Sequence, residues 1–282
     1  MKAKDQFPIL GLNAFRPALE GDSRLLYHEI QGSRLIEKPH KHDFFVFLLM
    51  EQGSGIHAID FVDYAVTGQQ IHLLFPDQVH RWELGADTMA YQLMISRRIF
   101  ETFSSSLHFS FLLYQNHPVI HLAPGIFQQL LYEFKAIQQE LGRGTIDWDI
   151  IHLRSQLIAQ LVCREAENKF DDMLIYQAKP VLFKYHALVD AAFKEQKSVS
   201  FYADQLHITP NYLNILCKRH LHMTATSLIQ NRVTLEAKRL LRASDKSVKE
   251  IAFELGFHDL AYFSNFLKSQ TGISPREFRG EL

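Results

Sequence analysis

Histidines in the first third of the chain have the residue type for metal or ligand chemistry. His40 and His42 form a His-x-His pair, and His80 lies farther along the chain. Neutral imidazoles on neighbouring strands can bind Fe, Mn, Ni or Zn. Three possible ligands without a fourth make a weak metal site, so we expect no metal and no other cofactor. We expect these histidines to line the mouth of a pocket instead.

The segment that carries the histidines has the pattern of short strands. From Ser23 to about Ile95, runs such as FFVFLLM and VHRWEL are rich in aromatic and β-branched residues. This spacing predicts a small sandwich or barrel, whose interior can hold one ligand. A barrel packed solid, which serves only in assembly, is the alternative. The side chains expected to bind a small-molecule effector are Arg34, His40, His42, Phe44, His80 and Trp82.

Apolar side chains on the same strands would form the walls of the pocket. Because side chains alternate along a strand, about half of the candidates should point outward or into ordinary core. The candidates are Phe44, Phe45, Phe47, Ile56, Ile59, Leu74, Trp82 and Tyr91.

Length and composition favour a folded chain of two domains. The 282 residues exceed what one compact core usually contains, and 47% are hydrophobic. The longest apolar run, Phe44 to Met50, is too short to cross a bilayer, and the first residues show no signal peptide. Cys163 and Cys217 suggest no disulfide framework. We therefore expect a cytoplasmic protein without a membrane partner.

Two helices should follow the strands. The patterns predict one helix over 124–141 and a second over roughly 147–168. The second helix has an apolar stripe that could pack on the barrel or on a second subunit. We favour a subunit contact for one of the two helices and expect a homodimer. The expected dimerisation residues are Ile150, Leu153, Leu157 and Leu161.

The C-terminal part contains a repeated unit of two short helices joined by a turn. In the second copy, Ser247 and Glu250 form a capping box, and Gly256 stands where a left-handed residue ends the first helix. A long helix from Ser227 to about Ala243 should join the copies. Ala203, Leu206 and Ile208 correspond to Ala252, Leu255 and Phe257, 49 positions later. Tyr212, Leu213, Leu216 and Lys218 correspond to Tyr262, Phe263, Phe266 and Lys268, 50 positions later.

A helix-turn-helix exposes the outer face of its second helix, which fits the major groove of DNA. Two units on one connecting helix could place two such helices one turn of duplex apart, about 34 Å. Residues 180–282 contain 14 Lys+Arg and 10 Asp+Glu, whereas residues 1–179 contain 16 and 21, which fits a polyanionic partner for the C-terminal part. Plain helical hairpins are the alternative. The duplicated turn chemistry favours double-stranded DNA as a partner.

The C-terminal part closely resembles the DNA-binding module of AraC/XylS-type transcription regulators. The resemblance covers roughly residues 185–280 and is carried by SVKEIAFELGFHDLAYFSNFLKSQTGISPREFR, YADQLHITPNYLNILCKRH and RVTLEAKRLL. Two departures lie in the first unit. Cys217 stands where the family usually has a bulky aromatic, and Leu221-His222 replaces the Thr-Gly found at Thr271-Gly272.

Residues 20–95 resemble the cupin-type sensing domain of many such regulators. Enzymatic cupins place metal-binding histidines where this chain has His40, His42 and His80. The usual carboxylate ligand is missing, because its place holds Val46 or Phe47. A metal-dependent cupin enzyme with an appended helical module is therefore the alternative function, and the missing carboxylate argues against it.

The two resemblances together imply an α+β multidomain fold. A cupin-like β-barrel with two following helices is expected for the sensing and dimerisation domain, residues 1–170. A linker should span 171–182. An all-α domain of two helix-turn-helix units joined by a linker helix should span 183–282.

The resemblance to the regulators also implies which side chains meet DNA. Asn can pair with the major-groove groups of adenine, Ile or Ala can contact a thymine methyl, and Asp can accept from cytosine. Basic and hydroxyl side chains nearby suit the phosphate backbone. The implied base contacts are Asn211, Asn214, Ile215, His258, Asp259, Ala261 and Asn265; the implied phosphate contacts are Thr209, Lys218, Arg219, Arg232, Lys249 and Lys268.

The function that follows is a sequence-specific transcription regulator and not an enzyme. The resemblance favours an activator that responds to a small-molecule effector in the barrel. Its expected partners are double-stranded DNA, the effector, a second copy of the chain, and RNA polymerase.

Overall fold

The computed structural model describes residues 9–10, 25–104, 117–170, 175–176 and 178–280. The described residues form two compact units, which divide between Lys169 and Phe170. Within these described ranges, no helix is both long enough and apolar enough to span a membrane. Residues 171–174 and 177 of the predicted linker lie outside the described part. The last three residues of that linker, from Pro180, belong to a helix instead.

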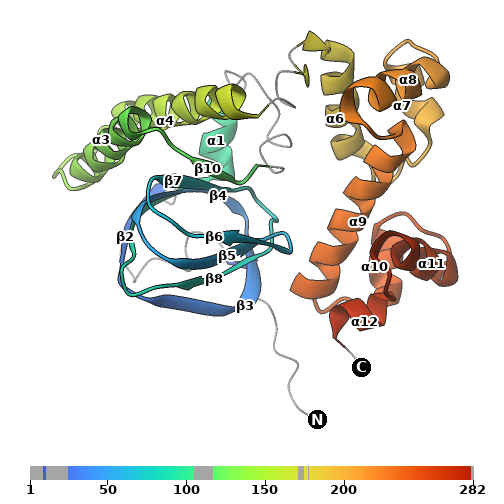
Figure 1. Cartoon of the computed structure of the whole chain (residues 1–282), viewed down its shortest axis with the longest axis horizontal. Coiled ribbons are helices and arrows are strands. Elements are labelled where there is room, and N and C mark those ends of the chain that lie inside the picture. The colour runs from blue at the N-terminus through green and yellow to red at the C-terminus, as the bar shows by residue number, and fades with distance from the viewer. Residues whose placement is uncertain (1–8, 11–24, 105–116, 171–174, 177, 281–282) are drawn as a thin grey trace. The chain divides into compact units, whose positions relative to one another are not determined.

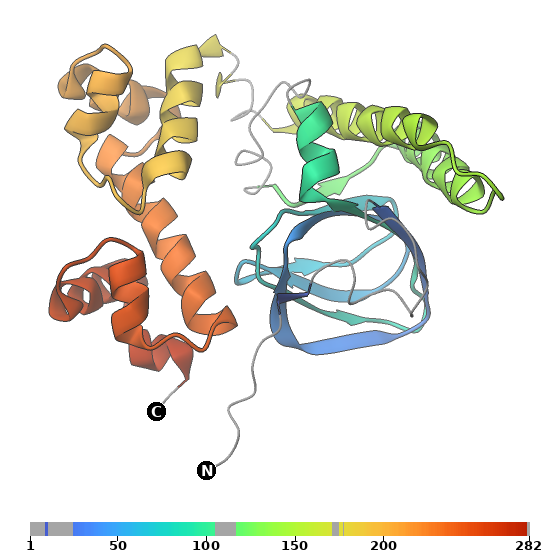
Figure 2. The same ribbon diagram turned by 180° about the vertical axis from the view of Figure 1, so that it is seen from behind.

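The N-terminal unit is a barrel of two five-stranded sheets, and Figures 1 and 2 show the strands closing around its interior. One sheet has the strand order β1-β3-β8-β5-β6 and the other β10-β7-β4-β9-β2. The strands are β1 (Ile9–Leu10), β2 (Leu25–Gln31), β3 (Arg34–His42), β4 (Phe44–Gln52), β5 (Gly55–Ile59), β6 (Val62–Ala65), β7 (Gln70–Leu74), β8 (His80–Leu84), β9 (Met89–Ser96) and β10 (Val119–His121).

Strand β4 is buried on both faces, which explains its continuous apolar sequence. Phe44, Val46 and Leu48 point into the barrel, where they join its hydrophobic core. Phe45 and Phe47 point to the outer face, which is also covered. Because successive side chains point to opposite faces, β4 contributes both to the core inside the barrel and to the core on its outer face.

Strand β3 contains Pro39, which weakens its strand pattern in the sequence. Proline has no N–H to donate to a ladder, and the register between β3 and β8 shifts between Ile36 and His40. Beyond this irregularity, His40 pairs with His80. The shift therefore brings the His-x-His pair beside the third predicted histidine.

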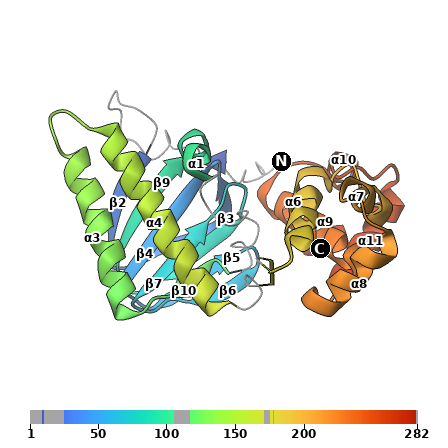
Figure 3. The ribbon, with the colours of Figure 1, turned by 90° about the horizontal axis from the view of Figure 1, so that it is seen from above.

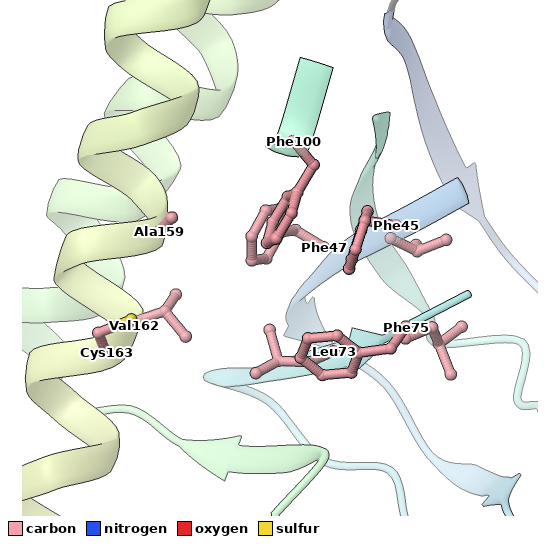
Figure 4. A pocket seen from close by; sticks show the side chains of 10 residues that line it. Phe45, Phe47, Leu73, Phe75, Phe100, Ala159, Val162 and Cys163 are labelled. Carbon is pink, nitrogen blue, oxygen red and sulfur yellow. The ribbon is translucent and has the colours of Figure 1, made fainter. Parts of the chain in front are cut away.

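Helices cover the outer face of the β10-β7-β4-β9-β2 sheet, as Figure 3 shows. They are α1 (Arg97–Ser104), α3 (Pro124–Leu141) and α4 (Trp148–Lys169). The two predicted helices are confirmed, and both ends of the second lie one residue later than predicted. Phe100 of α1 stacks on Phe45, and Figure 4 shows Ala159 and Val162 of α4 facing this aromatic cluster. The void left there is about 20 Å³, so this region is packed core.

The C-terminal unit is all helical. Helix α9 runs through it, contacts α6, α8, α10, α11 and α12, and confirms the predicted connecting helix. Figure 1 shows α7 and α8 at one end of α9, and α10, α11 and α12 at the other. The helices are α6 (Pro180–Ala192), α7 (Val199–Gln205), α8 (Pro210–Leu221), α9 (Ala225–Ala243), α10 (Val248–Glu254), α11 (Leu260–Thr271) and α12 (Pro275–Arg279).

The turns of the two repeated units use the predicted chemistry. Ser247 and Glu250 form both hydrogen bonds of a capping box. Gly256 has φ 74°, and a Cβ there would lie 2.0 Å from the carbonyl oxygen of Lys194. Only glycine suits both the left-handed backbone and this close approach. His207, at the corresponding turn of the first unit, is also left-handed, with φ 55°.

Candidate functional site

Helices α8 and α11, which we call the reading helices, each bury one face and expose the other. Asn211 and Ile215 are exposed on α8, and Ala261 and Asn265 are exposed at the corresponding positions of α11. Each pair is four residues apart and therefore lies on one side of its helix. The opposite faces are buried through Leu213, Cys217, Phe263 and Leu267.

The N-terminal ends of the reading helices are capped by predicted DNA-contacting residues. The Thr209 side chain accepts a hydrogen bond from the Tyr212 N–H at 3.1 Å, and Asp259 accepts from the Tyr262 N–H at 2.6 Å. Both caps remain exposed, as does His258 beside them. These side chains thus fix the helix start at the end of the helix that the motif presents to DNA.

Asn214 differs from the other predicted base contacts. It is half-buried, and its Oδ1 accepts a hydrogen bond from the Ala225 N–H at 3.2 Å. This bond satisfies one of the unpaired N–H groups at the start of α9. The carboxamide oxygen of Asn214 therefore holds two helices together, which does not fit a bidentate contact with adenine.

Four of the predicted phosphate contacts are exposed basic side chains: Lys218, Arg219, Lys249 and Lys268. Lys218 and Arg219 lie in the last turn of α8, and Lys268 lies in the last turn of α11. Cations near a helix C-terminus also interact favourably with its dipole. Their exposure leaves them able to meet a polyanion.

Arg232, a predicted phosphate contact, differs from the exposed cations because its side chain is engaged inside the unit. Its guanidinium pairs with Asp190 of α6 at 2.5 Å and with Glu236 of α9 at 3.0 Å. It also lies over the ring of Phe193, 3.9 Å from the centroid. Arg232 therefore joins α6 to α9 inside the unit.

Sequence reasoning missed two exposed aromatics on the reading helices. Tyr212 is 49% exposed and Tyr262 is 66% exposed, and they occupy equivalent positions of the two units. Large aromatic side chains usually bury most of their surface. The recurrence of tyrosine at these positions was the signal that could have singled them out.

The barrel of the N-terminal unit contains a cavity of about 430 Å³, which we call the effector cavity. Arg34, His40, His42, His80 and Trp82 line it, whereas Phe44 stacks on His42 with ring centroids 4.5 Å apart. Trp82 is buried, and its Nε1 meets no hydrogen-bond acceptor among the described residues. The remaining lining residues are Leu26, Tyr27, His28, Ile30, Leu35, Ile36, Gln92 and Met94.

The alternation of strand side chains divides the predicted wall residues as expected. Phe44, Ile59, Leu74 and Trp82 belong to the core inside the barrel. Ile56 is 41% exposed, and Phe45, Phe47 and Tyr91 are buried outside that core. Of all these candidates, only Trp82 lines the effector cavity.

His40, His42 and His80 bring one ring nitrogen each within 4.8 Å of the others, so they could hold a metal ion. Two of these nitrogens face each other closely, because Nε2 of His42 lies 2.7 Å from Nε2 of His80. The two nitrogens are therefore within hydrogen-bonding distance. A metal ion would have to break this contact and separate the two rings.

The His42–His80 contact begins a longer hydrogen-bonded series, which we call the histidine chain. Nδ1 of His80 lies 3.1 Å from Nε2 of His57, and Nδ1 of His57 lies 2.8 Å from Nδ1 of His72. Nε2 of His72 then lies 3.1 Å from Oε1 of Gln70. The chain therefore runs from the effector cavity on one sheet to β7 on the other.

Burial favours the neutral form of three rings in the histidine chain, those of His57, His72 and His80. It lowers the pKa of His57 and of His80 well below the ordinary value, and neighbouring imidazoles act in the same direction. Burial lowers the pKa of His72 to about 3. The pKa of His40, which lines the cavity beside them, is also lowered by burial. Desolvation penalises the charged form of each ring.

The predicted dimerisation residues form an exposed stripe on α4, made of Ile150, Leu153, Leu157 and Leu161. Leu153 is 67% exposed and Leu157 is 44% exposed, whereas the other two are half-buried. The helix buries a different face through Ile151, Ser155, Ile158, Ala159, Val162 and Cys163.

Comparison with known proteins shows relatives over most of the chain. Residues 25–146 match the family described as AraC-like ligand binding domain, and residues 202–281 match the family described as Helix-turn-helix domain. The HTH-type transcriptional activator RhaS of Escherichia fergusonii is 24% identical over 265 residues, which cover 85% of this chain and 86% of the relative. RhaS of Citrobacter koseri is 23% identical over 266 residues, with the same two shares.

Among solved structures, the similar proteins include ToxT of Vibrio cholerae strain SCE256, crystallised with an unsaturated fatty acid bound. It is 14% identical and the match covers 93% of this chain and 96% of ToxT, with a TM-score of 0.44.

Proposed function

This chain belongs to the AraC-type transcription regulators, and we propose that it activates specific genes when a small molecule binds its barrel. The observation that best supports this proposal is the matched pair of reading helices, each with a buried apolar face and an exposed face that carries an asparagine. The RhaS relatives are named transcriptional activators, which supports the direction of regulation.

In this proposal the reading helices enter successive major grooves of double-stranded DNA. Asn211 and Ile215 meet base edges from α8, and Ala261 and Asn265 meet them from α11, because these side chains share the exposed faces. The exposed cations Lys218, Arg219, Lys249 and Lys268 contact phosphates and set the register.

The effector binds in the effector cavity of the barrel. Its volume of about 430 Å³ suits a small metabolite, and its wall combines apolar side chains with a few polar groups. Trp82 offers a buried N–H donor, and His40 offers a neutral imidazole. A thermal-shift screen of small metabolites tests this site, because a bound metabolite should raise the melting temperature of the wild-type protein. The same metabolite should not raise the melting temperature of Trp82→Phe.

A homodimer would form through the exposed stripe on α4. Exposed leucines at Leu153 and Leu157 are unfavourable in a lone chain, and burying them against a second copy removes them from water. Pairing two DNA-binding units also raises the affinity of each through effective concentration. As a cytoplasmic activator without enzymatic activity, the dimer would contact RNA polymerase at its promoters.

A metal-dependent enzyme is the second candidate, and the cluster of His40, His42 and His80 is the observation that favours it. The cluster offers only imidazoles, and two of them are hydrogen-bonded to each other. Metal analysis of the purified protein separates the candidates. Stoichiometric Fe, Mn, Ni or Zn would support the enzyme.

DNA binding is tested by a gel shift on the region upstream of the gene that encodes the chain. The proposal expects a specific complex that weakens steeply as salt rises, since phosphate contacts release counterions. Lys268→Ala should reduce the slope of log affinity against log salt concentration by about one. Equal affinity for this region and for unrelated duplexes of the same length would count against the proposal.

A further inference from the structure

We propose that Gln70, His72 and His57 are positioning residues for the effector cavity, although none of them lines it. They fix which nitrogen carries the proton on His80 and His42, and so decide which hydrogen-bonding groups the cavity wall offers. This inference rests on the proposed ligand-binding role of the barrel.

Gln70 anchors the chain, because two backbone groups determine how its carboxamide is turned. The Thr67 N–H donates to Oε1 at 2.8 Å, and Nε2 donates to the Ala65 carbonyl at 3.1 Å. A backbone N–H cannot accept and a carbonyl cannot donate, so the two ends cannot be exchanged. Oε1 of Gln70 must therefore accept the hydrogen bond from Nε2 of His72.

This single acceptor sets the proton on each following ring, since a neutral imidazole has one donor and one acceptor. His72 carries its proton on Nε2, so its Nδ1 accepts from Nδ1 of His57. His57 then accepts at Nε2 from Nδ1 of His80. His80 in turn accepts at Nε2 from Nε2 of His42.

The wall of the effector cavity therefore shows a defined pattern. His42 carries its proton on Nε2 and has a lone pair on Nδ1. His40 donates from Nδ1 to the Lys38 carbonyl at 3.4 Å and has a lone pair on Nε2. The two imidazoles thus act as hydrogen-bond acceptors, and the matching ligand group is a donor such as a hydroxyl or an N–H. Trp82 supplies a donor of its own.

The low pKa values of the enclosed rings agree with this assignment, because a doubly protonated ring has no acceptor and would interrupt the chain. Three of the rings are neutral because burial penalises their charged forms. Their neutrality follows from burial, whereas the position of each proton follows from Gln70.

The test is nitrogen NMR of the full-length protein labelled with ¹⁵N-histidine, which reports which ring nitrogen of each imidazole carries the proton. At neutral pH we expect Nδ1–H for His57 and His80 and Nε2–H for His72 and His42. The opposite pattern, or doubly protonated rings, would overturn the proposal. The spectrum requires no effector and no DNA, so its result is independent of whether the chain regulates genes.

Three variants show whether Gln70 sets the pattern. Gln70→Met removes the acceptor and should leave His72, His57 and His80 as mixtures of both tautomers. Gln70→Glu keeps an acceptor for His72, and its buried carboxyl, when protonated, still donates to the Ala65 carbonyl, so this variant should keep the wild-type pattern. Gln78→Met is the matched control, because Gln78 is equally buried and accepts the Phe75 N–H at 2.8 Å, outside the histidine chain.

An unchanged tautomer pattern in Gln70→Met would contradict the positioning role of Gln70. The same mixture in Gln78→Met would show that general loosening of the barrel is responsible, which would also contradict it. If Gln70→Met does not fold, the wild-type and Gln70→Glu spectra still decide the assignment.

Discussion

His57 and His72 join the two sheets of the barrel through their ring nitrogens. The Nδ1 atoms lie 2.8 Å apart, although His57 is on β5 and His72 is on β7 of the opposite sheet. Both side chains are fully buried. A hydrogen bond in such surroundings is costly to break, because each partner would be left unsatisfied away from water.

The buried histidines predict that the N-terminal unit loses stability in mild acid. The unfolded pKa of His72 is near 6.5 and the folded pKa is about 3, so the folded state binds fewer protons. Stability from this group is present above pH 6.5 and is lost as pH falls toward 3. At pH 5 the loss from His72 is about 2 kcal/mol, and His57 and His80 act in the same direction.

Tryptophan fluorescence in urea can measure this loss for the N-terminal unit alone, since Trp82 and Trp148 both lie in it. The unfolding midpoint should be lower at pH 5 than at pH 7. Exposed His207→Gln serves as a control that should not alter the difference. Equal midpoints at the two pH values would refute the neutral histidine chain.

Arg232 should be needed for folding of the C-terminal unit rather than directly for DNA binding. Arg232→Ala removes the partner of the half-buried Asp190 and should cost about 2–3 kcal/mol of unfolding free energy. Lys268→Ala, at an exposed position, should change stability by less than about 0.5 kcal/mol. Thermal melts followed by helical circular dichroism measure both. If Arg232→Ala were as stable as the wild type but bound DNA more weakly, that result would support the predicted role of Arg232 as a phosphate contact.

His222 ends α8 in a left-handed conformation, with φ 54°, where α11 ends in Gly272 with φ 83°. Side chains other than glycine are strained there. His222→Gly should therefore raise the unfolding free energy by about 0.5–1 kcal/mol, and Gly272→Ala should lower it by about 1 kcal/mol. Both are read from melting temperatures. A lower melting temperature for His222→Gly would mean that the imidazole contributes more than the strain costs.

The exposed stripe on α4 predicts a dimer that a charge can dissociate. Leu157→Glu should convert the protein to monomers at micromolar concentration, because a buried glutamate in the contact lacks a partner. Val62→Glu, on exposed β6, is the control and should keep the wild-type mass. Light scattering coupled to gel filtration measures the mass. A wild-type protein that is already monomeric, or a Leu157→Glu dimer, would exclude this contact.

The helix-turn-helix units were predictable because their signals are local. The caps at Ser247 and Thr209 act within a few residues of their own position, and so does the left-handed backbone of Gly256, although its close approach to Lys194 does not. The capping box and the helix starts followed from residue type alone. Of the two ion pairs of Arg232, only the one with Glu236 could be predicted from the sequence, because Glu236 lies one helical turn away. Asp190 belongs to another helix.

The histidine chain was not predictable because it depends on contacts between distant strands. His57, His72 and Gln70 have no special spacing in the sequence, and they meet only when the two sheets face each other. The irregular register after Pro39 also had to be seen before His40 could be placed beside His80. Side-chain pairing across a barrel is set by register, which local patterns leave open.

The central claim is that the exposed faces of α8 and α11 read DNA sequence, and selection of sites from random duplexes followed by footprinting tests it most directly. For each bound copy of the chain we predict two protected segments about one helical turn apart. Asn265→Ala should relax base preference in one segment of each pair only, at a cost of about 1–3 kcal/mol. Asn231→Ala, at an exposed position of α9, should leave the footprint unchanged. A protein that selects no sequence, or one in which both alanine variants behave alike, would contradict the account.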